Sequence, residues 1–289
     1  MSDTSPELSN VRAVLFDMDG LLIDSERIYT DVVNQILKPY GKEQTWEIKS
    51  KLMGKPERPA TLVLLSEVWP PRPGNKEDEA RGYSGECPFT LDDFLAERNA
   101  KLLPAFEKVP PMPGALRLVQ HLAHHNIPIC VATGSKRHNF NIKARANADI
   151  FAPFGERVVC GDDADLQRGK PSPDVFLLAA HRGLGIQDTP AGKEWLRTIR
   201  LPGEEHDGKF LGGEGQVLVF EDALPGVQAG LSAGMKVVWV PDPNVCIYGY
   251  INAQLCQITK EGPPVGADQE LRSLEDFQPE QWGLPPFER

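Results

Sequence analysis

Residues 11–26 read VRAVLFDMDGLLIDSE. Their first six residues form a largely apolar run, which is typical of a strand buried on both faces of a parallel sheet. Asp17 and Asp19 follow before Gly20, so we expect both carboxylates at the carboxyl end of that strand, where open α/β sheets bind their ligands. Because side chains alternate along an extended chain, both acids should point to the same side. A plain turn with Gly20 at positive φ would also explain these residues.

The composition narrows the class of protein. With 289 residues, 40% of them hydrophobic, the chain can form one large domain or two modest ones. Its formal net charge of −10, with no basic block, argues against a partner with a nucleic-acid backbone. Residues 1–10 lack the apolar core of a signal peptide, and no apolar run approaches the roughly 20 residues of a membrane span. We therefore expect a cytoplasmic protein with no nucleic-acid and no membrane partner.

The number and spacing of the cysteines also fit a cytoplasmic protein. The chain has five, with no C-x-x-C spacing among them. Cys130 and Cys160 lie inside apolar, strand-like runs, so we expect them to be small buried hydrophobes and not metal ligands or disulfide partners.

The apolar spacing divides the chain into two parts. From residue 24 to residue 110 it is helical, and within this stretch residues 70–86, rich in proline, glycine and charge, read as an exposed loop. Strands and helices alternate afterwards, which implies a parallel sheet with right-handed crossovers. We therefore predict an α/β protein with a Rossmann-like parallel-sheet core, residues 1–23 and 111–289, and an inserted α-helical cap domain, residues 24–110.

The individual elements follow from the same periodicity. Helices are expected at 25–38, 45–53, 60–69 and 90–106 in the insertion, and at 115–125, 136–148, 174–182 and 224–233 in the core. The sheet should have about five strands, at 11–16, 127–132, 157–160, 217–220 and 236–240. Residues 187–216 read as a surface insertion, and the chain after Asn244 as loops and short elements that pack back on the core.

The second core strand ends in a segment suited to an anion. Thr133 offers a hydroxyl group there, and Gly134, Ser135 and Lys136 follow at the start of a helix, whose N-terminal N–H groups favour negative charge. Simple capping of the helix by Thr133 or Ser135 is the alternative.

Two more segments place charge near the same edge of the sheet. Lys170 precedes Pro171 and Pro173, so it lies on a constrained backbone that favours a placed charge over an ordinary surface lysine. Glu221 and Asp222 end another buried strand, which brings four carboxylates to one edge. Like charges about 4 Å apart repel by roughly 4 kcal/mol at a surface-like dielectric, so this cluster requires a cation. Oxygen-only ligands beside a substrate phosphate favour Mg²⁺.

These motifs together resemble the haloacid-dehalogenase-like superfamily of phosphatases. Within it, the motifs look most like those of the pseudouridine-5′-phosphatase group, and the same arrangement also resembles β-phosphoglucomutase and the small sugar-phosphate phosphatases. The matching segments are Phe16-Asp-Met-Asp-Gly20, Met53-Gly-Lys-Pro56, Gly161-Asp-Asp163, Gly169-Lys-Pro171, Phe220-Glu-Asp-Ala223, Asp276-Phe-Gln-Pro279 and Gly283-Leu-Pro285. The loops at 70–88 and 187–216 look longer than in that group.

The resemblance implies a role for each motif residue. Asp17 would be the nucleophile that becomes an aspartyl-phosphate, and Asp19 the acid and base for the leaving alcohol and the water. Thr133 and Lys170 would hold the phosphoryl group, with Gly134, Ser135 and Lys136 beside it. The metal, Mg²⁺, would be held by Asp17, Asp19 through its backbone carbonyl, Glu221 and Asp222. The cap residues Glu26, Lys55 and Arg58 could face the leaving group, although a solvated helix surface is the favoured explanation because charged residues are mostly exposed.

The expected function is therefore a Mg²⁺-dependent phosphomonoesterase that acts on a small nucleotide or sugar phosphate, with pseudouridine 5′-phosphate as the specific candidate. A sugar phosphomutase would use the same residues and differ only in its product. A dehalogenase would not need the acid and base that Asp19 provides. A non-catalytic binding module of the same fold is the alternative outside enzymes, and a monomer is the expected state.

Overall fold

The computed structural model describes residues 11–52, 55, 57–185, 217–242 and 266–288. The described chain falls into two compact units, which are treated separately. The first contains residues 11–24, 110–185, 217–242 and 266–288, and the second contains the described part of residues 25–109. The surface insertion expected at 187–216, the part of the tail at 244–265, and the Met53, Gly54 and Pro56 positions of one motif lie outside the described residues.

The first unit is built on a six-stranded parallel sheet with the strand order β3-β2-β1-β4-β5-β6. The strands are β1 (Ala13–Phe16), β2 (Ile129–Ala132), β3 (Val158–Val159), β4 (Val217–Glu221), β5 (Lys236–Trp239) and β6 (Gln269–Glu270). β1, β2 and β4 are buried along their whole length, as expected of central strands in a parallel sheet. The predicted Rossmann-like α/β fold is confirmed, with the sixth strand added at one edge.

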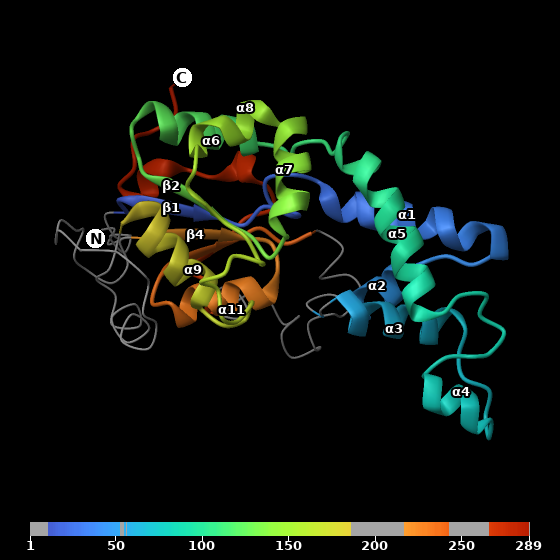
Figure 1. The fold of residues 1–289 in the computed structure, drawn as a ribbon. Coiled ribbons are helices and arrows are strands. Elements are labelled where there is room, and N and C mark those ends of the chain that lie inside the picture. The colour runs from blue at the N-terminus through green and yellow to red at the C-terminus, as the bar shows by residue number, and fades with distance from the viewer. Residues whose placement is uncertain (1–10, 53–54, 56, 186–216, 243–265, 289) are drawn as a thin grey trace, which may run out of the picture. The chain divides into compact units, whose positions relative to one another are not determined.

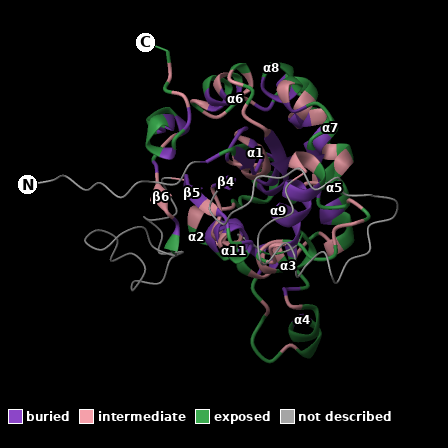
Figure 2. Ribbon diagram, turned by 90° about the vertical axis from the view of Figure 1, so that its left-hand side faces the viewer, coloured by how far each residue is buried: buried purple, intermediate pink, exposed green. Residues whose placement is uncertain are grey.

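Helices cover both faces of this sheet, and Figure 1 shows α6 and α8 on one side of the strands with α9 and α11 on the other. α6 has buried residues at positions 115, 118, 119 and 122, which gives it one buried and one exposed side (Figure 2). The helices of this unit are α6 (Ala115–His124), α7 (Arg137–Ala146), α8 (Ala148–Phe151), α9 (Asp174–Leu178), which a π-helical turn continues over Ala179–Gly183, and α11 (Leu224–Ser232), with 3-10 turns at Ala152–Phe154, Leu274–Asp276 and Pro279–Trp282.

Aromatic rings fill the core beside the central strands. The rings of Phe16 and Phe220 stack with their centroids 5.2 Å apart, because β1 and β4 pair these two residues in register. Phe154 packs edge-on against Phe16, and Phe277 against Phe220. Cys130 and Cys160 are free and fully buried, and burial raises the pKa of each thiol to about 12. Neither thiol is therefore a reactive group at neutral pH.

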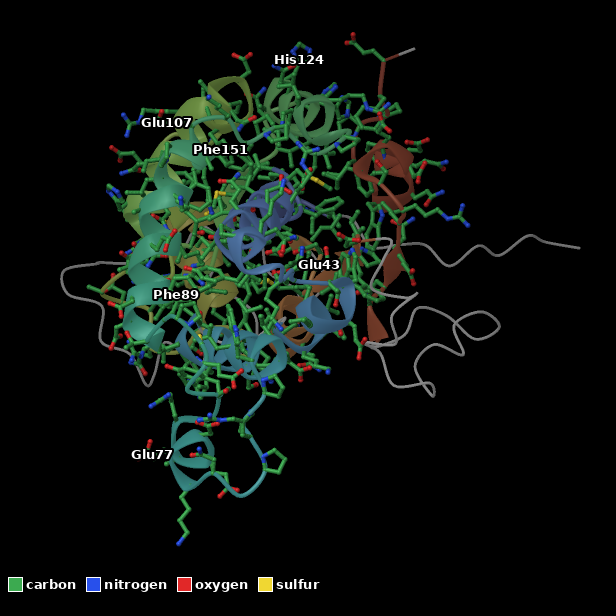
Figure 3. All side chains as sticks on the ribbon, turned by 90° about the vertical axis from the view of Figure 1, so that its right-hand side faces the viewer. Glu43, Glu77, Phe89, Glu107, His124 and Phe151 are labelled. Carbon is green, nitrogen blue, oxygen red and sulfur yellow. The ribbon has the colours of Figure 1, made fainter. Side chains whose placement is uncertain are left out.

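Helices are the only regular elements among the described residues of the second unit. It contains α1 (Ser25–Leu37), a 3-10 turn at Lys38–Tyr40, α2 (Trp46–Leu52), α3 (Glu57–Val68), α4 (Lys76–Arg81) and α5 (Leu91–Phe106). Phe89, labelled in Figure 3, contacts Tyr40, Trp69 and Phe94 through edge-on ring packing. These rings join the chain between α4 and α5 to the helices around it.

The expectation of an unbroken exposed loop at residues 70–86 is wrong, because α4 lies inside it. Asn75 caps this helix by accepting hydrogen bonds from the N–H groups of Glu77 and Asp78. Asp78 is buried and pairs with Arg72, while Glu77 points outward (Figure 3). The proline and glycine content hid a short helix that one cap and one ion pair stabilise. Among the described residues, no helix combines the length and apolar character that a membrane crossing requires.

Candidate active site

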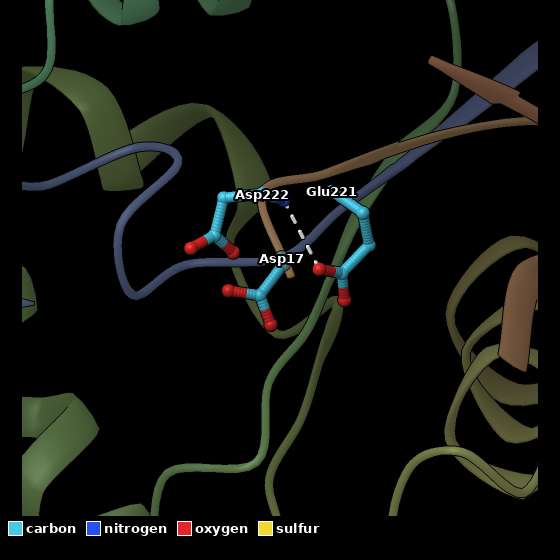
Figure 4. A group of neighbouring side chains, drawn as sticks. All are labelled: Asp17, Glu221 and Asp222. Atoms are coloured by element: carbon cyan, nitrogen blue, oxygen red, sulfur yellow. Dashed lines mark hydrogen bonds between the residues drawn. The ribbon is translucent and has the colours of Figure 1, made fainter. Parts of the chain in front are cut away.

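Three carboxylates meet at the carboxyl edge of the central strands (Figure 4). Asp17 follows β1, Glu221 ends β4 and Asp222 comes next, and one oxygen of each lies within 4.8 Å of the others. The strand register explains the meeting: Phe16 pairs with Phe220, and the Asp17 N–H donates to the Phe220 carbonyl at 3.0 Å. The sequence-based expectation that these strand ends converge thus holds for these three acids.

The start of α11 holds Glu221 in place. Its Oε2 accepts the backbone N–H groups of Asp222 at 3.1 Å and Ala223 at 3.2 Å. Gly226, in the first turn of α11, leaves room for the same carboxylate, since a Cβ atom there would lie 1.8 Å from Oε1. On the other side of the loop, the Trp239 indole N–H donates to the Asp222 carbonyl at 2.9 Å. The acidic strand end is therefore fixed on both sides.

Lys170 lies between two of the acids. Its Nζ contacts Asp17 Oδ1 and Glu221 Oε1, and donates to the Ala132 carbonyl at 3.2 Å. The Lys170 side chain is 14% exposed, so the charge sits within the site and not on the open surface. The lysine whose flanking prolines suggested a placed charge thus contacts two of the grouped acids.

The charges in this cluster shift the pKa values of their neighbours. Burial, with the carboxylates of Glu221 and Asp19, raises the pKa of Asp17 to about 7 although Lys170 opposes the shift. Burial alone would lower the pKa of Lys170, but Asp17 and Glu221 raise it above its ordinary value. Lys170 therefore stays protonated, and the site without a metal carries more acid than one ammonium can balance.

The loop after β2 supplies hydroxyl groups. Thr133 is fully buried, and its Oγ1 accepts the Ser135 N–H at 3.0 Å. Gly134 and Lys136 are exposed. The chain after β3 supports this loop, because the Gly161 N–H donates to the Ser135 carbonyl at 2.9 Å and a Cβ at Gly161 would lie only 2.2 Å from the Gly134 carbonyl oxygen.

The side chain of Asp19 lies outside the group of three acids that could hold a metal ion. Its Oδ2 accepts the Ser135 hydroxyl at 2.6 Å, and its Oδ1 contacts Lys143 Nζ at 2.5 Å. Sequence reasoning did not identify Lys143 as a site residue, because a lysine within a polar helix is expected to be exposed to solvent. The spacing could have indicated its burial, because Lys143 comes three residues after the buried Phe140 and so lies on the same face of α7.

The expected substrate contacts of the insertion lie in the second unit. Glu26, in the first turn of α1, forms an ion pair with Lys49 at 3.2 Å, and Lys49 Nζ lies 4.9 Å from the centre of the Trp46 ring. Lys49 is buried. Sequence reasoning did not identify it, because a lysine in a polar helix is expected to be solvated, as for Lys143. Lys55 and Arg58 are exposed, and Arg58 pairs with Asp92.

Comparison with known proteins places the chain in a family. The model of the haloacid dehalogenase-like hydrolases matches residues 11–190, which contain the Asp17, Thr133 and Lys170 segments. The chain belongs to the haloacid dehalogenase-like hydrolases. The resemblance inferred from the motifs is thereby confirmed.

Two curated relatives match over nearly their whole length. The chain is 37% identical to (DL)-glycerol-3-phosphatase 2 of Arabidopsis thaliana, over 96% of this chain and 94% of that protein. It is 32% identical to a probable pseudouridine-5′-phosphatase of Drosophila melanogaster, over 97% of each. The crystal structure of a HAD family hydrolase from Deinococcus radiodurans with bound phosphate and sodium shares the fold, with a TM-score of 0.62, 22% identity, and coverage of 96% of this chain and 100% of that one.

Proposed function

We propose that this protein is a Mg²⁺-dependent phosphomonoesterase that removes phosphate from a small phosphorylated metabolite by way of an aspartyl-phosphate. The main supporting observation is that Asp17, Glu221 and Asp222 meet at the carboxyl edge of the sheet, and that Lys170 contacts the first two. This is the arrangement of nucleophile, counter-charge and oxygen ligands that phosphoryl transfer requires. Relatives that span the whole chain are named as phosphatases, which supports the same reaction.

The donor set fits Mg²⁺. The three grouped side chains offer only oxygen atoms, and their negative charges exceed the positive charge of Lys170. Asp17, Asp222 and the backbone carbonyl of Asp19 would hold the ion, with Glu221 next to it. When bound, Mg²⁺ neutralises phosphoryl oxygens and offsets the repulsion among the acids.

Each residue of the site would then have its own role in the reaction. A carboxylate oxygen of Asp17 attacks phosphorus as the bond from phosphorus to the leaving oxygen breaks, and Asp19 gives that oxygen its proton. Asp19 next takes a proton from water, whose oxygen attacks the phosphorus of the aspartyl-phosphate and releases inorganic phosphate. Lys170 neutralises the oxygens of Asp17 and of the phosphoryl group. The Thr133 oxygen accepts the Ser135 N–H, so its hydroxyl hydrogen can point to a phosphoryl oxygen.

Substrate recognition would be shared between the two units. Gly134, Ser135 and Lys136 stand at the start of α7, where backbone N–H groups and a cation suit the phosphate. Residues 24–110 would be the cap domain, with Glu26 and Lys55 as contacts of the leaving group. A cytoplasmic protein without nucleic-acid or membrane partners remains the prediction from composition and sequence pattern, and a monomer remains the expected state.

Two substrate chemistries have support. The segments that resemble pseudouridine-5′-phosphatases favour a nucleotide such as pseudouridine 5′-phosphate, and a relative at 37% identity is named for glycerol 3-phosphate. Both are esters of phosphate with a primary alcohol. We therefore propose such alkyl phosphomonoesters as the substrate class.

A phosphate-release screen tests this function. Purified protein with Mg²⁺ should release phosphate from glycerol 3-phosphate, from pseudouridine 5′-phosphate or from both, and the Asp17→Asn variant should release it at least about a thousandfold more slowly. An isomerised sugar phosphate without free phosphate would assign a mutase instead. No turnover of any phosphomonoester, including p-nitrophenyl phosphate, would favour a binding module and overturn the proposal.

A further inference from the structure

Lys143 is a fully buried lysine that no step of the reaction above uses. It lies on α7, its side chain is 0% exposed, and its Nζ lies 2.5 Å from Asp19 Oδ1 and 3.0 Å from Ser135 Oγ. The Ser135 hydroxyl in turn donates to Asp19 Oδ2 at 2.6 Å. Two different side chains therefore engage the two oxygens of the Asp19 carboxylate.

Stability alone is a poor explanation for this arrangement. Removing an ammonium group from water is costly, and apolar residues of similar volume often replace a buried ion pair without loss of stability. The neighbouring buried position of α7 is apolar: Phe140 packs edge-on against Phe151, with ring centroids 5.6 Å apart. A methionine or leucine at position 143 would extend that apolar face, so the charge points to a role at Asp19.

The burial of Lys143 also separates its role from that of Lys170. Lys170 is partly exposed and contacts Asp17 and Glu221. Lys143 has no exposed surface, so substrate cannot reach it, and its ion pair is with an acid outside that group. The site thus pairs one lysine with the nucleophile and a second with the residue assigned to proton transfer.

We propose that Lys143, together with Ser135, is a positioning residue that fixes the plane of the Asp19 carboxylate for proton transfer to the leaving group and from water. The proposal rests on the function proposed above. A carboxylate has about four lone-pair positions, so two contacts can fix its plane while it still carries a proton. Rotation of Asp19 would otherwise move its oxygens away from the leaving oxygen, and misplacement of a catalytic group slows the reaction strongly.

The leaving group provides a readout that a structural role would not change. An alkoxide must be protonated as it departs, whereas p-nitrophenolate departs without an acid. The first step, release of the alcohol as Asp17 is phosphorylated, is measured in single turnover with Mg²⁺, using glycerol 3-phosphate and p-nitrophenyl phosphate. Lys143→Met should slow this step about 10- to 100-fold for glycerol 3-phosphate, since general acid catalysis contributes about 10²–10⁴, and less than about threefold for p-nitrophenyl phosphate.

A double variant tests whether Lys143 acts through Asp19. With p-nitrophenyl phosphate, decay of the phosphorylated enzyme should be slow in both Lys143→Met and Asp19→Asn. In the Asp19→Asn background, Lys143→Met should add less than about a twofold further loss, because the group that it positions is already gone. Arg145→Met is the matched control, since it removes an exposed cation from the same helix and should leave both steps unchanged.

Equal losses for the two esters, an additive loss in the double variant, or wild-type rates in Lys143→Met would each overturn the proposal. If Lys143→Met does not fold by circular dichroism, Ser135→Ala removes the other contact from a half-buried position and should show the same selectivity between leaving groups. Failure of the wild-type protein to release phosphate from either ester would instead overturn the proposed function, which separates the two outcomes.

Discussion

Gly226 leaves the space that the Glu221 carboxylate occupies, and a Cβ atom at this position would lie 1.8 Å from Oε1. The contact joins the first turn of α11 to the last residue of β4, which lies five residues earlier in the chain. The missing side chain at position 226 lets the Glu221 carboxylate lie against the start of α11 while it contacts Lys170.

Gly226→Ala should therefore disturb the metal site directly. The added methyl group forces Glu221 to move, and we expect Mg²⁺ affinity, measured as the Mg²⁺ concentration for half-maximal phosphatase rate, to weaken at least about tenfold, in the range of changes next to metal ligands. Gly230→Ala is the matched control: its Cβ would crowd Val237 on β5, so it should lower the thermal midpoint with little change in Mg²⁺ dependence. Equal Mg²⁺ dependence in both variants would contradict the assignment.

The raised pKa of Asp17 gives the metal-free protein a characteristic pH dependence. Because the folded state holds a proton that the unfolded chain releases above its ordinary pKa of 3.8, the free energy of unfolding should fall as pH rises from about 4 to about 7. Asp17→Asn should remove that part of the slope. Denaturant titrations in EDTA at several pH values measure it, and identical slopes for the two proteins would argue against the raised pKa.

Metal choice follows from the ligand set. Mg²⁺ should activate the enzyme and raise its thermal midpoint, because an ion that binds only the folded state stabilises it. Ca²⁺ should inhibit, since it takes more ligands at longer distances and would disturb the attacking oxygen of Asp17. Steady-state rates in EDTA, Mg²⁺ and Ca²⁺ test this, and equal rates with the two ions would exclude the proposed role of the metal.

Asp17→Asn should lower turnover by at least about a thousandfold, as the loss of a nucleophile does in other enzymes. The change replaces the carboxylate with a carboxamide of nearly the same shape, so the fold should persist. Asp149→Asn alters an exposed aspartate on α8 and should retain the wild-type rate. Rates and circular dichroism of the three proteins, compared together, separate loss of chemistry from loss of structure.

Apolar patterning was sufficient for most of the fold. The runs that end at Phe16 and Phe220 predicted the central strands, and the acids after them predicted the site. β6 could not be predicted from Gln269 and Glu270, two polar residues that become a strand only by pairing with β5. α4 was hidden by prolines and glycines around its Asn75 cap.

The contact between Asp19 and Lys143 could not be predicted from the sequence. Lys143 lies 124 residues further along the chain, and its burial depends on the packing of α7. Local composition around it is polar, so only the spacing from Phe140 hinted at a buried face. Long-range ion pairs of this kind become visible only when the fold brings both residues together.

The most direct test of the central claim is to trap the phosphorylated enzyme. Wild-type protein is mixed rapidly with Mg²⁺ and p-nitrophenyl phosphate, quenched in acid, digested and analysed by mass spectrometry. The expected result is one phosphoryl group on Asp17, present in Asp149→Asn and absent from Asp17→Asn. Release of phosphate by the wild-type protein with Asp17 unmodified at every quench time would contradict the account.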